Sequence, residues 1–332
     1  MDSPPKYNYG KKGNYIREGC VKTIRYIFQY ALDNQITRMF FLGDIHALKD
    51  KLPNKLKNPL IDLFEEFNDV AYKFIIVGNH DRYNEELAIK YLKPYAEVIQ
   101  DVEIDSSFGT SIVMVPCLSN IRDIIKTLKG YQIDLLLGHF FIKESLAGRF
   151  SDNSVPLEML DNCRTVIVGH DHEFQRLAQD IYVLGSIYQE DWGEADQSKF
   201  ICVYEKGKTE FIEIPLFINR KDIALNSNLD IDEHMAYKPR IEEGLFYMAR
   251  LICNKPIDTA LLNSYKRFLL DEGYVRVDVI PYIAQMQKGT MMKGMRSDFM
   301  VQDMIERSLT DIKGMHKKFI CHKVIREIER GL

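Results

Sequence analysis

Short apolar runs recur along the first half of the chain, and each of them stops at a glycine. Short runs rich in aliphatic and aromatic residues are typical of strands that are buried on both faces of a sheet. We therefore predict buried strands at these positions. The runs are residues 39–42, 74–77, 133–137 and 165–168.

Amphipathic segments separate these runs. In the first of them Cys20, Ile24, Phe28 and Ala31 follow helical spacing and form one apolar face. Helices that alternate with buried strands, followed by a strand-rich stretch, predict a mixed α/β (α+β) fold, in which two sheets form a β-sandwich flanked by helices. The predicted helices are residues 14–33, 54–68, 85–92 and 121–128, and further strands are predicted at 97–100, 111–115, 182–184, 199–205 and 208–214.

The pattern changes in the last third of the chain. Residues 216–234 show little periodicity and contain several Asn and Asp residues, so we predict a linker there. A strand, a helix and a strand at 245–253, 258–270 and 274–280 predict a small β-α-β unit. Two apolar stripes after residue 296 predict terminal helices. The expected domains are residues 1–220, 235–284 and 285–332.

The composition is that of an ordinary globular protein, with 46% hydrophobic and 28% charged residues. The net charge of -4 excludes a global basic field, although a local basic groove stays compatible with it. Six scattered cysteines without a Cys-x-x-Cys pair indicate reduced thiols. No apolar run reaches the length of a membrane span and no signal sequence precedes residue 14, so we expect a cytoplasmic protein without a membrane partner.

A side chain that can bind a metal follows each of the four apolar runs. Hard divalent cations prefer carboxylate and amide oxygens, and imidazole adds affinity for manganese, iron or zinc. The order Asp, Asn-His, His, His-x-His predicts a dinuclear metal site at the carboxyl edge of a sheet. The candidate ligands are Asp44, Asn79, His139, His170 and His172.

His80 and Asp81 follow the candidate ligand Asn79 directly. A histidine backed by a carboxylate suits proton donation, or neutralisation of charge on a phosphate, so we predict these two residues as catalytic. Each motif alone has an ordinary explanation, because Gly-Asp after a strand is usually a turn. The prediction depends on all four motifs in this order.

These motifs resemble those of the calcineurin-like metallophosphoesterases. The resemblance covers roughly residues 14–215 and implies that family's four-layer fold and its metal-dependent hydrolysis of phosphoesters. The matching motifs are Gly43-Asp44, Gly78-Asn79-His80-Asp81, Gly138-His139 and Gly169-His170-Asp171-His172.

A narrower resemblance concerns the segment from Gly185 to Glu194, followed by Lys199. It looks like the corresponding segment of SbcD-type DNA double-strand-break repair nucleases, and Val155-Pro156 also fits them. This resemblance implies a metal-dependent exonuclease and endonuclease for duplex DNA ends, acting in repair, recombination and replication. It further implies a DNA capping domain, a helical tail that docks on an SbcC-type ATPase, and a homodimer.

The resemblance also implies roles for the site residues. Asp44 would bridge two metal ions, which are expected to be Mn²⁺. His172 would bind one ion, and His80 would be the catalytic histidine. The other ion would be held by Asn79, His139 and His170.

The chain departs from the family at its N-terminus. The family begins with a strand that ends in Asp-x-His and supplies two ligands of one metal, and no such motif precedes Asp44 here. Three explanations stay open: the strand lies upstream of this sequence, the protein is a mono-metal or inactive form, or His46 or Asp2 substitutes as a ligand. We expect the first, because losing an interior strand leaves apolar surface and unpaired backbone groups.

Two other functions stay open at this point. The chain could be a metallophosphatase or phosphodiesterase that acts on other phosphoesters. It could also be a catalytically degenerate scaffold that lacks the first metal site and holds one ion at most.

Overall fold

The structure is a computed structural model that describes residues 15–45, 54–83, 86–107 and 109–282. The predicted terminal helices of the domain 285–332, and the alternative ligands His46 and Asp2, lie outside the described residues. The described chain has a mixed α/β fold with several sheets and five α-helices. None of these described helices is both long enough and apolar enough to cross a membrane.

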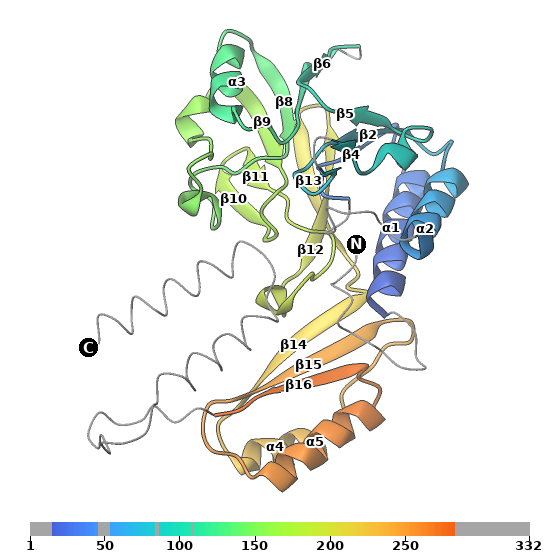
Figure 1. The fold of residues 1–332 in the computed structure, drawn as a ribbon, viewed down its shortest axis with the longest axis vertical. Coiled ribbons are helices and arrows are strands. Elements are labelled where there is room, and N and C mark those ends of the chain that lie inside the picture. The colour runs from blue at the N-terminus through green and yellow to red at the C-terminus, as the bar shows by residue number, and fades with distance from the viewer. Residues whose placement is uncertain (1–14, 46–53, 84–85, 108, 283–332) are drawn as a thin grey trace, which may run out of the picture. The chain divides into compact units, whose positions relative to one another are not determined.

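Two sheets organise the first part of the fold (Figure 1). The smaller consists of β1 (Arg38–Phe41), β2 (Tyr72–Ile76) and β5 (Glu97–Ile99), which are parallel. The larger consists of β6 (Glu103–Asp105), β7 (Ile112–Val115), β8 (Ile133–Gly138), β9 (Cys163–Val168), β10 (Gln175–Ala178) and β11 (Ile181–Val183). Its strand order is β10-β11-β9-β8-β7-β6, and only the two edge strands, β10 and β6, are antiparallel to their neighbours.

The two sheets share one hydrophobic cluster. Ile76 of the smaller sheet lies in the same buried cluster as Leu135 and Ile167 of the larger sheet. The adjacent Ile75 and Leu136 belong to two other clusters, which contain helical residues. Both sheets are therefore buried on both faces, as their continuous apolar runs predict. The helices in these clusters are α1 (Tyr15–Asp33) and α2 (Asn54–Glu66) on the smaller sheet and α3 (Ile121–Leu128) on the larger.

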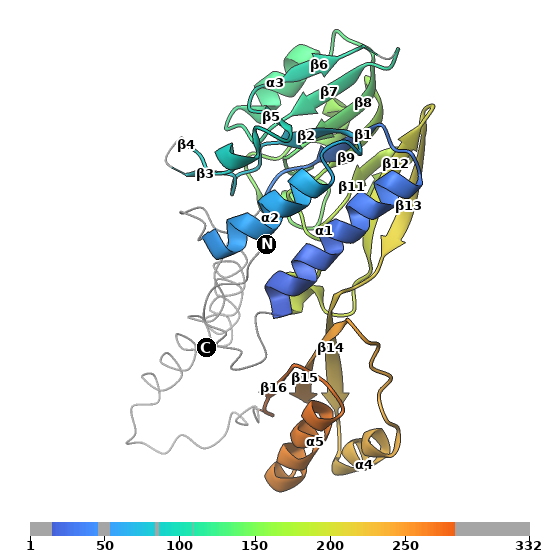
Figure 2. The ribbon, with the colours of Figure 1, turned by 90° about the vertical axis from the view of Figure 1, so that its right-hand side faces the viewer.

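The helices form where the sequence carries an apolar stripe. Phe28 of α1 is fully buried and packs on Phe64 and Phe67, with ring centroids 5.3 Å away in both cases. Figure 2 shows α1 and α2 lying side by side, as their contacts require. The hairpin of β12 (Lys199–Glu205) and β13 (Lys208–Ile214) has the predicted bounds, and its Phe211 packs against the cluster shared by the two sheets.

A separate parallel sheet follows the hairpin. It is formed by β14 (Ile218–Leu225), β15 (Phe246–Cys253) and β16 (Arg276–Ile280). Figure 1 shows α4 (Asn228–Ala236) and α5 (Thr259–Asp271) on one face of this sheet, and their side chains complete a cluster of their own. The predicted β-α-β unit is therefore confirmed, with one more strand than expected.

Two element predictions are wrong. Residues 216–234 are not a linker, because they form β14 and most of α4. The charged residues of β14 hid its strand pattern, and Asp222 among them pairs with Arg250 of β15. Residues 85–92 are not an α-helix: β3 (Arg82–Tyr83) pairs with β4 (Glu86–Leu87), and a 3₁₀ turn follows at Lys90–Leu92.

Candidate metal centre

The loops after β1, β2, β8 and β9 bring four of the predicted ligands together. β1 and β2 are parallel neighbours in the smaller sheet, and β8 and β9 are parallel neighbours in the larger sheet. The carboxyl ends of each pair therefore lie at the same edge of their sheet. Asp44 and Asn79 follow the first pair of strands, and His139 and His170 follow the second. The predicted convergence of these four residues is therefore present in the structure.

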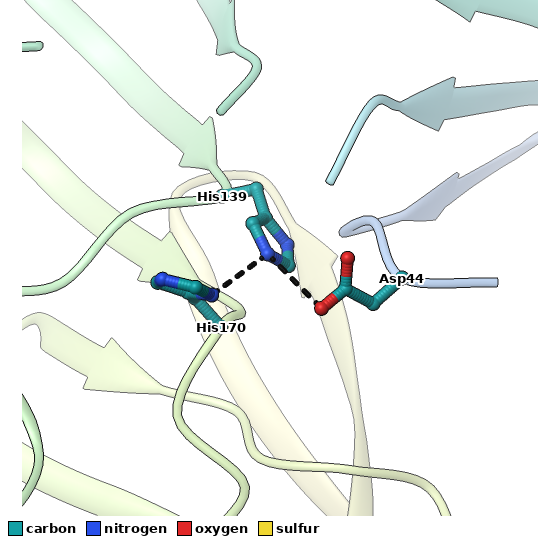
Figure 3. A group of neighbouring side chains, drawn as sticks. All are labelled: Asp44, His139 and His170. Atoms are coloured by element: carbon teal, nitrogen blue, oxygen red, sulfur yellow. Dashed lines mark hydrogen bonds and ion pairs between the residues drawn. The ribbon is translucent and has the colours of Figure 1, made fainter. Parts of the chain in front are cut away.

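The imidazole of His139 lies at the centre of the group (Figure 3). Its Nε2 is 3.0 Å from Asn79 Oδ1, 3.0 Å from His170 Nδ1 and 3.4 Å from Asp44 Oδ2. The ligand atoms of Asp44, His139 and His170 all lie within 4.8 Å of one another. Ligands in adjacent positions around a divalent ion are about 3.0 Å apart when the bonds are about 2.1 Å long, so this spacing suits one ion.

The hydrogen bonding of His139 leaves its Nε2 as an acceptor. The Nδ1 atom lies 2.6 Å from the carbonyl oxygen of Leu42, which can only accept, so Nδ1 carries the proton in the neutral ring. Nε2 then directs its lone pair toward the oxygens of Asp44 and Asn79 and the ring of His170. Converging acceptors repel one another unless a proton or a cation lies among them, and a set of oxygen and nitrogen donors of this kind suits a divalent metal.

Burial and charge shift the pKa values of the three titratable residues in this group. Burial acts to raise the pKa of Asp44, but hydrogen bonding and attraction from His139 lower it well below its ordinary value. Burial acts to lower the pKa of His139, but hydrogen bonding and attraction from the Asp44 carboxylate raise it above its ordinary value, so an ion bound at Nε2 would replace a proton. Burial, with repulsion from His139, lowers the pKa of His170 to about 3, so this ring is neutral at pH 7. Ionised carboxylate and neutral imidazole are the forms that bind metals.

The backbone is strained where it presents two of these ligands. Asp44 has φ 53° and His170 has φ 83°, in the left-handed region that side chains other than glycine rarely adopt. Such strain persists only where surrounding structure enforces it, and it is common at functional sites. Gly78 is required for another reason, since a Cβ there would lie 2.2 Å from Asp44 Oδ1.

Asp81 is fully buried and joins two of the loops. Its Oδ2 accepts hydrogen bonds of 2.8 Å from the N–H groups of Asp44 and Gly78, and its Oδ1 accepts one of 2.9 Å from Ile45. Burial raises its pKa to about 6. These contacts show that Asp81 holds the loop of Asp44 and the loop of Gly78 together. The catalytic role that the sequence suggests for Asp81 beside His80 stays a prediction. The N–H of His80 donates to Asp44 Oδ1 at 2.8 Å.

His172 belongs to a different group. Its Nδ1 lies 3.0 Å from Glu194 Oε1 and 3.2 Å from Glu190 Oε2. Burial acts to lower the pKa of His172, but Glu194 and Glu190 raise it to about 9. The sequence pattern missed both glutamates, because acidic residues in a loop carry no distinguishing signal. The available hint was their position between Gly185 and Lys199, in the segment that resembles the repair nucleases.

Comparison with known proteins adds no assignment, since no family model matches the chain and no curated protein matches its sequence.

Proposed function

We propose that this protein is a metal-dependent phosphodiester hydrolase. The observation that carries the proposal is the convergence of Asp44, Asn79, His139 and His170 from four loops. Asn79 Oδ1, His170 Nδ1 and Asp44 Oδ2 lie 3.0, 3.0 and 3.4 Å from His139 Nε2. Such a mixed oxygen and nitrogen set is suited to Mn²⁺ and to similar divalent ions. The proposed centre is therefore built from residues that the fold brings together from opposite sheets.

The proposed chemistry divides between the ion and the side chains. A divalent ion at this centre supplies Lewis acidity for a phosphoryl oxygen and lowers the pKa of a bound water. Asp44, Asn79, His139 and His170 hold the ion. His80 follows a ligand directly and its backbone is bonded to Asp44, so it is positioned to donate a proton to the leaving oxygen or to neutralise phosphate charge. Asp81 keeps the two loops in register.

The arrangement of clusters supports the metallophosphoesterase architecture. Two sheets share an inner cluster, and helices complete the clusters on both outer faces. We infer the four-layer sandwich of the calcineurin-like metallophosphoesterases from this order, in which the ligands come from loops at the edges of both sheets.

We further propose duplex DNA ends as the substrate. The support is the resemblance of residues 185–199 to the SbcD-type nucleases and the extra sheet of β14, β15 and β16 in the place of a capping domain. From the same resemblance we also propose an SbcC-type ATPase as a partner, a homodimer as the assembly and a second Mn²⁺ ion as a cofactor. One observation favours a second candidate, a scaffold with a single ion: His172 lies outside the Asp44 group.

The experiment compares Mn²⁺-dependent cleavage of linear duplex DNA by the full chain and by His170→Ala. We expect the variant to lose at least about 99% of the activity, because removing a metal ligand removes the ion that activates water. His234→Ala is the matched control, since His234 is an exposed histidine on α4. Full activity of His170→Ala would overturn the assignment of the centre. Cleavage of nitrophenyl phosphates without cleavage of DNA would favour a phosphatase.

A further inference from the structure

Two aromatic side chains at the start of the loop after β8 have different surroundings. Phe140, which directly follows the candidate ligand His139, is buried in the hydrophobic cluster of the larger sheet. Phe141 is only partly buried, and its ring lies against the imidazole of His170, with ring centroids 3.8 Å apart and planes inclined by 39°. The same imidazole lies beside the ring of His139, with centroids 4.6 Å apart. The His170 ring therefore contacts both a flat apolar ring and the central residue of the proposed metal centre.

Backbone hydrogen bonds hold the chain that carries Phe141. Its carbonyl oxygen accepts a bond of 2.8 Å from the N–H of Val155, and the N–H of Lys143 donates to the carbonyl oxygen of Val155 at 2.9 Å. Ile142, which lies between these two residues of the loop, forms a parallel bridge with Val155 and is fully buried. The ring of Phe141 therefore reaches His170 from a fixed backbone.

A second contact ties the same loop to the residue after His170. Oδ2 of Asp171 accepts hydrogen bonds of 3.0 Å from the N–H of Ala147 and of 3.1 Å from Nε2 of Gln175. Oε1 of Gln175 in turn accepts one of 2.8 Å from the N–H of Leu146. The backbone of His170 has φ 83°, and such a conformation persists only where neighbouring contacts enforce it. The hydrogen bonds of Asp171 supply such contacts directly beside His170.

We propose that Phe141 and Asp171 are positioning residues for His170. Together they hold its imidazole with Nδ1 3.0 Å from His139 Nε2, the arrangement drawn in Figure 3. The ring of Phe141 restricts rotation of the imidazole, and Asp171 fixes the backbone that carries it. A ligand that is already held in its bound orientation loses little freedom when an ion binds, so it binds more tightly than a mobile one. The effect on affinity rests on the proposed metal centre, whereas the restriction of His170 does not.

The experiment follows the ring ¹⁵N signals of His170 while Zn²⁺, which is diamagnetic, is added to the chelator-treated full chain. Absence of these signals from His170→Ala assigns them. Phe141→Leu keeps an apolar side chain but removes the flat ring, and it should raise the Kd reported by His170 at least about tenfold. Phe141→Tyr should keep the wild-type Kd, because the partly exposed ring leaves room for a hydroxyl. Phe150→Leu is the matched control, since Phe150 is an exposed aromatic residue of the same loop.

Two variants of Asp171 separate its hydrogen bonds from its charge. Asp171→Ala removes the acceptor of the Ala147 N–H, so it should also raise the Kd for Zn²⁺ at least about tenfold. Asp171→Asn removes the negative charge, but its amide oxygen can take the place of Oδ2 and accept both bonds, so it should bind Zn²⁺ nearly as tightly as the wild type. Equal weakening in the two variants would show that Asp171 acts through its charge and would overturn its positioning role.

The motion of the His170 ring gives a readout that needs no metal. In the metal-free wild type, NMR relaxation should show a restricted ring, and Phe141→Leu should show a more mobile one. The role of Phe141 is overturned if Phe141→Leu leaves this motion or the Kd unchanged, or if Phe141→Tyr binds as weakly as Phe141→Leu. Failure of Zn²⁺ to shift the His170 signals of the wild type would instead contradict the proposed function, and the ring motion would still decide the role of Phe141.

Discussion

At the scale of single residues, the candidate site consists of polar side chains that follow glycines, and two of these side chains, Asp44 and His170, lie on strained backbone. Asp44, Asn79, His139 and His170 could be predicted from sequence, because each directly follows a glycine that ends an apolar run. The role of Asp81 could not be predicted, since nothing in Gly-Asn-His-Asp shows that its carboxylate accepts backbone N–H groups from two loops.

Replacement of Asp81 tests its positioning role. In Asp81→Asn the amide N–H₂ takes the place of one carboxylate oxygen and faces backbone donors, so at least one buried N–H group loses its acceptor. We expect a loss of about 2 kcal/mol in the free energy of unfolding, measured by urea denaturation. Asp62→Asn on the exposed face of α2 is the control and should change it by less than about 0.5 kcal/mol. Equal effects of the two changes would contradict the role.

Gly78 provides a test of the close approach between the first two loops. A methyl group at Gly78 cannot coexist with Asp44 Oδ1 in its present position, so the carboxylate must move. We expect Gly78→Ala to weaken metal binding at the Asp44 centre at least about tenfold, as measured by calorimetric titration with Mn²⁺. Gly130→Ala is the control, because a Cβ at Gly130 meets no atom within 4 Å. Unchanged affinity in Gly78→Ala would show that Asp44 is not a ligand.

At the scale of elements, strands with continuous apolar runs or with alternating apolar and polar residues were predictable, and β14, with its block of charged residues, was not. Residues 199–205 and 208–214 were predicted with the bounds that the structure gives. β14 was missed because its polar residues find partners within the fold, as when the guanidinium of Arg250 donates to the Asp222 carboxylate. Tertiary partners of this kind leave no trace in local periodicity.

A buried ion pair links β12 to the 3₁₀ turn Trp192–Glu194, and we predict that it stabilises the fold. Lys199 and Glu194 have side chains that are 1% and 7% exposed. Lys199→Met leaves the Glu194 carboxylate buried beside one cation fewer, so we expect a loss of about 3–5 kcal/mol in the free energy of unfolding. Lys206→Met is the control, since Lys206 is 86% exposed. A loss below about 1 kcal/mol in Lys199→Met, measured by urea denaturation without metal, would contradict the structural importance of this pair.

At the scale of the whole molecule, the proposed metal centre and the parallel sheet of β14, β15 and β16 lie in one chain. The centre is built from the loops of two sheets that share a core, so its geometry depends on the packing of the sheets and not on any one motif. That dependence explains why sequence could predict which residues converge and could not predict that His172 joins Glu190 and Glu194. The sequence order places His172 beside His170, but the contacts of its side chain are set by the segment before β12.

The most direct test of the central claim is anomalous diffraction from crystals of the full chain soaked with Mn²⁺, recorded at the manganese absorption edge. We predict a peak about 2.1–2.4 Å from Asp44 Oδ2, Asn79 Oδ1, His139 Nε2 and His170 Nδ1. The same peak should vanish in His170→Ala and persist in His234→Ala. A map with no anomalous peak among these four side chains, at Mn²⁺ concentrations that saturate binding in solution, would contradict the metal centre and the hydrolase proposed from it.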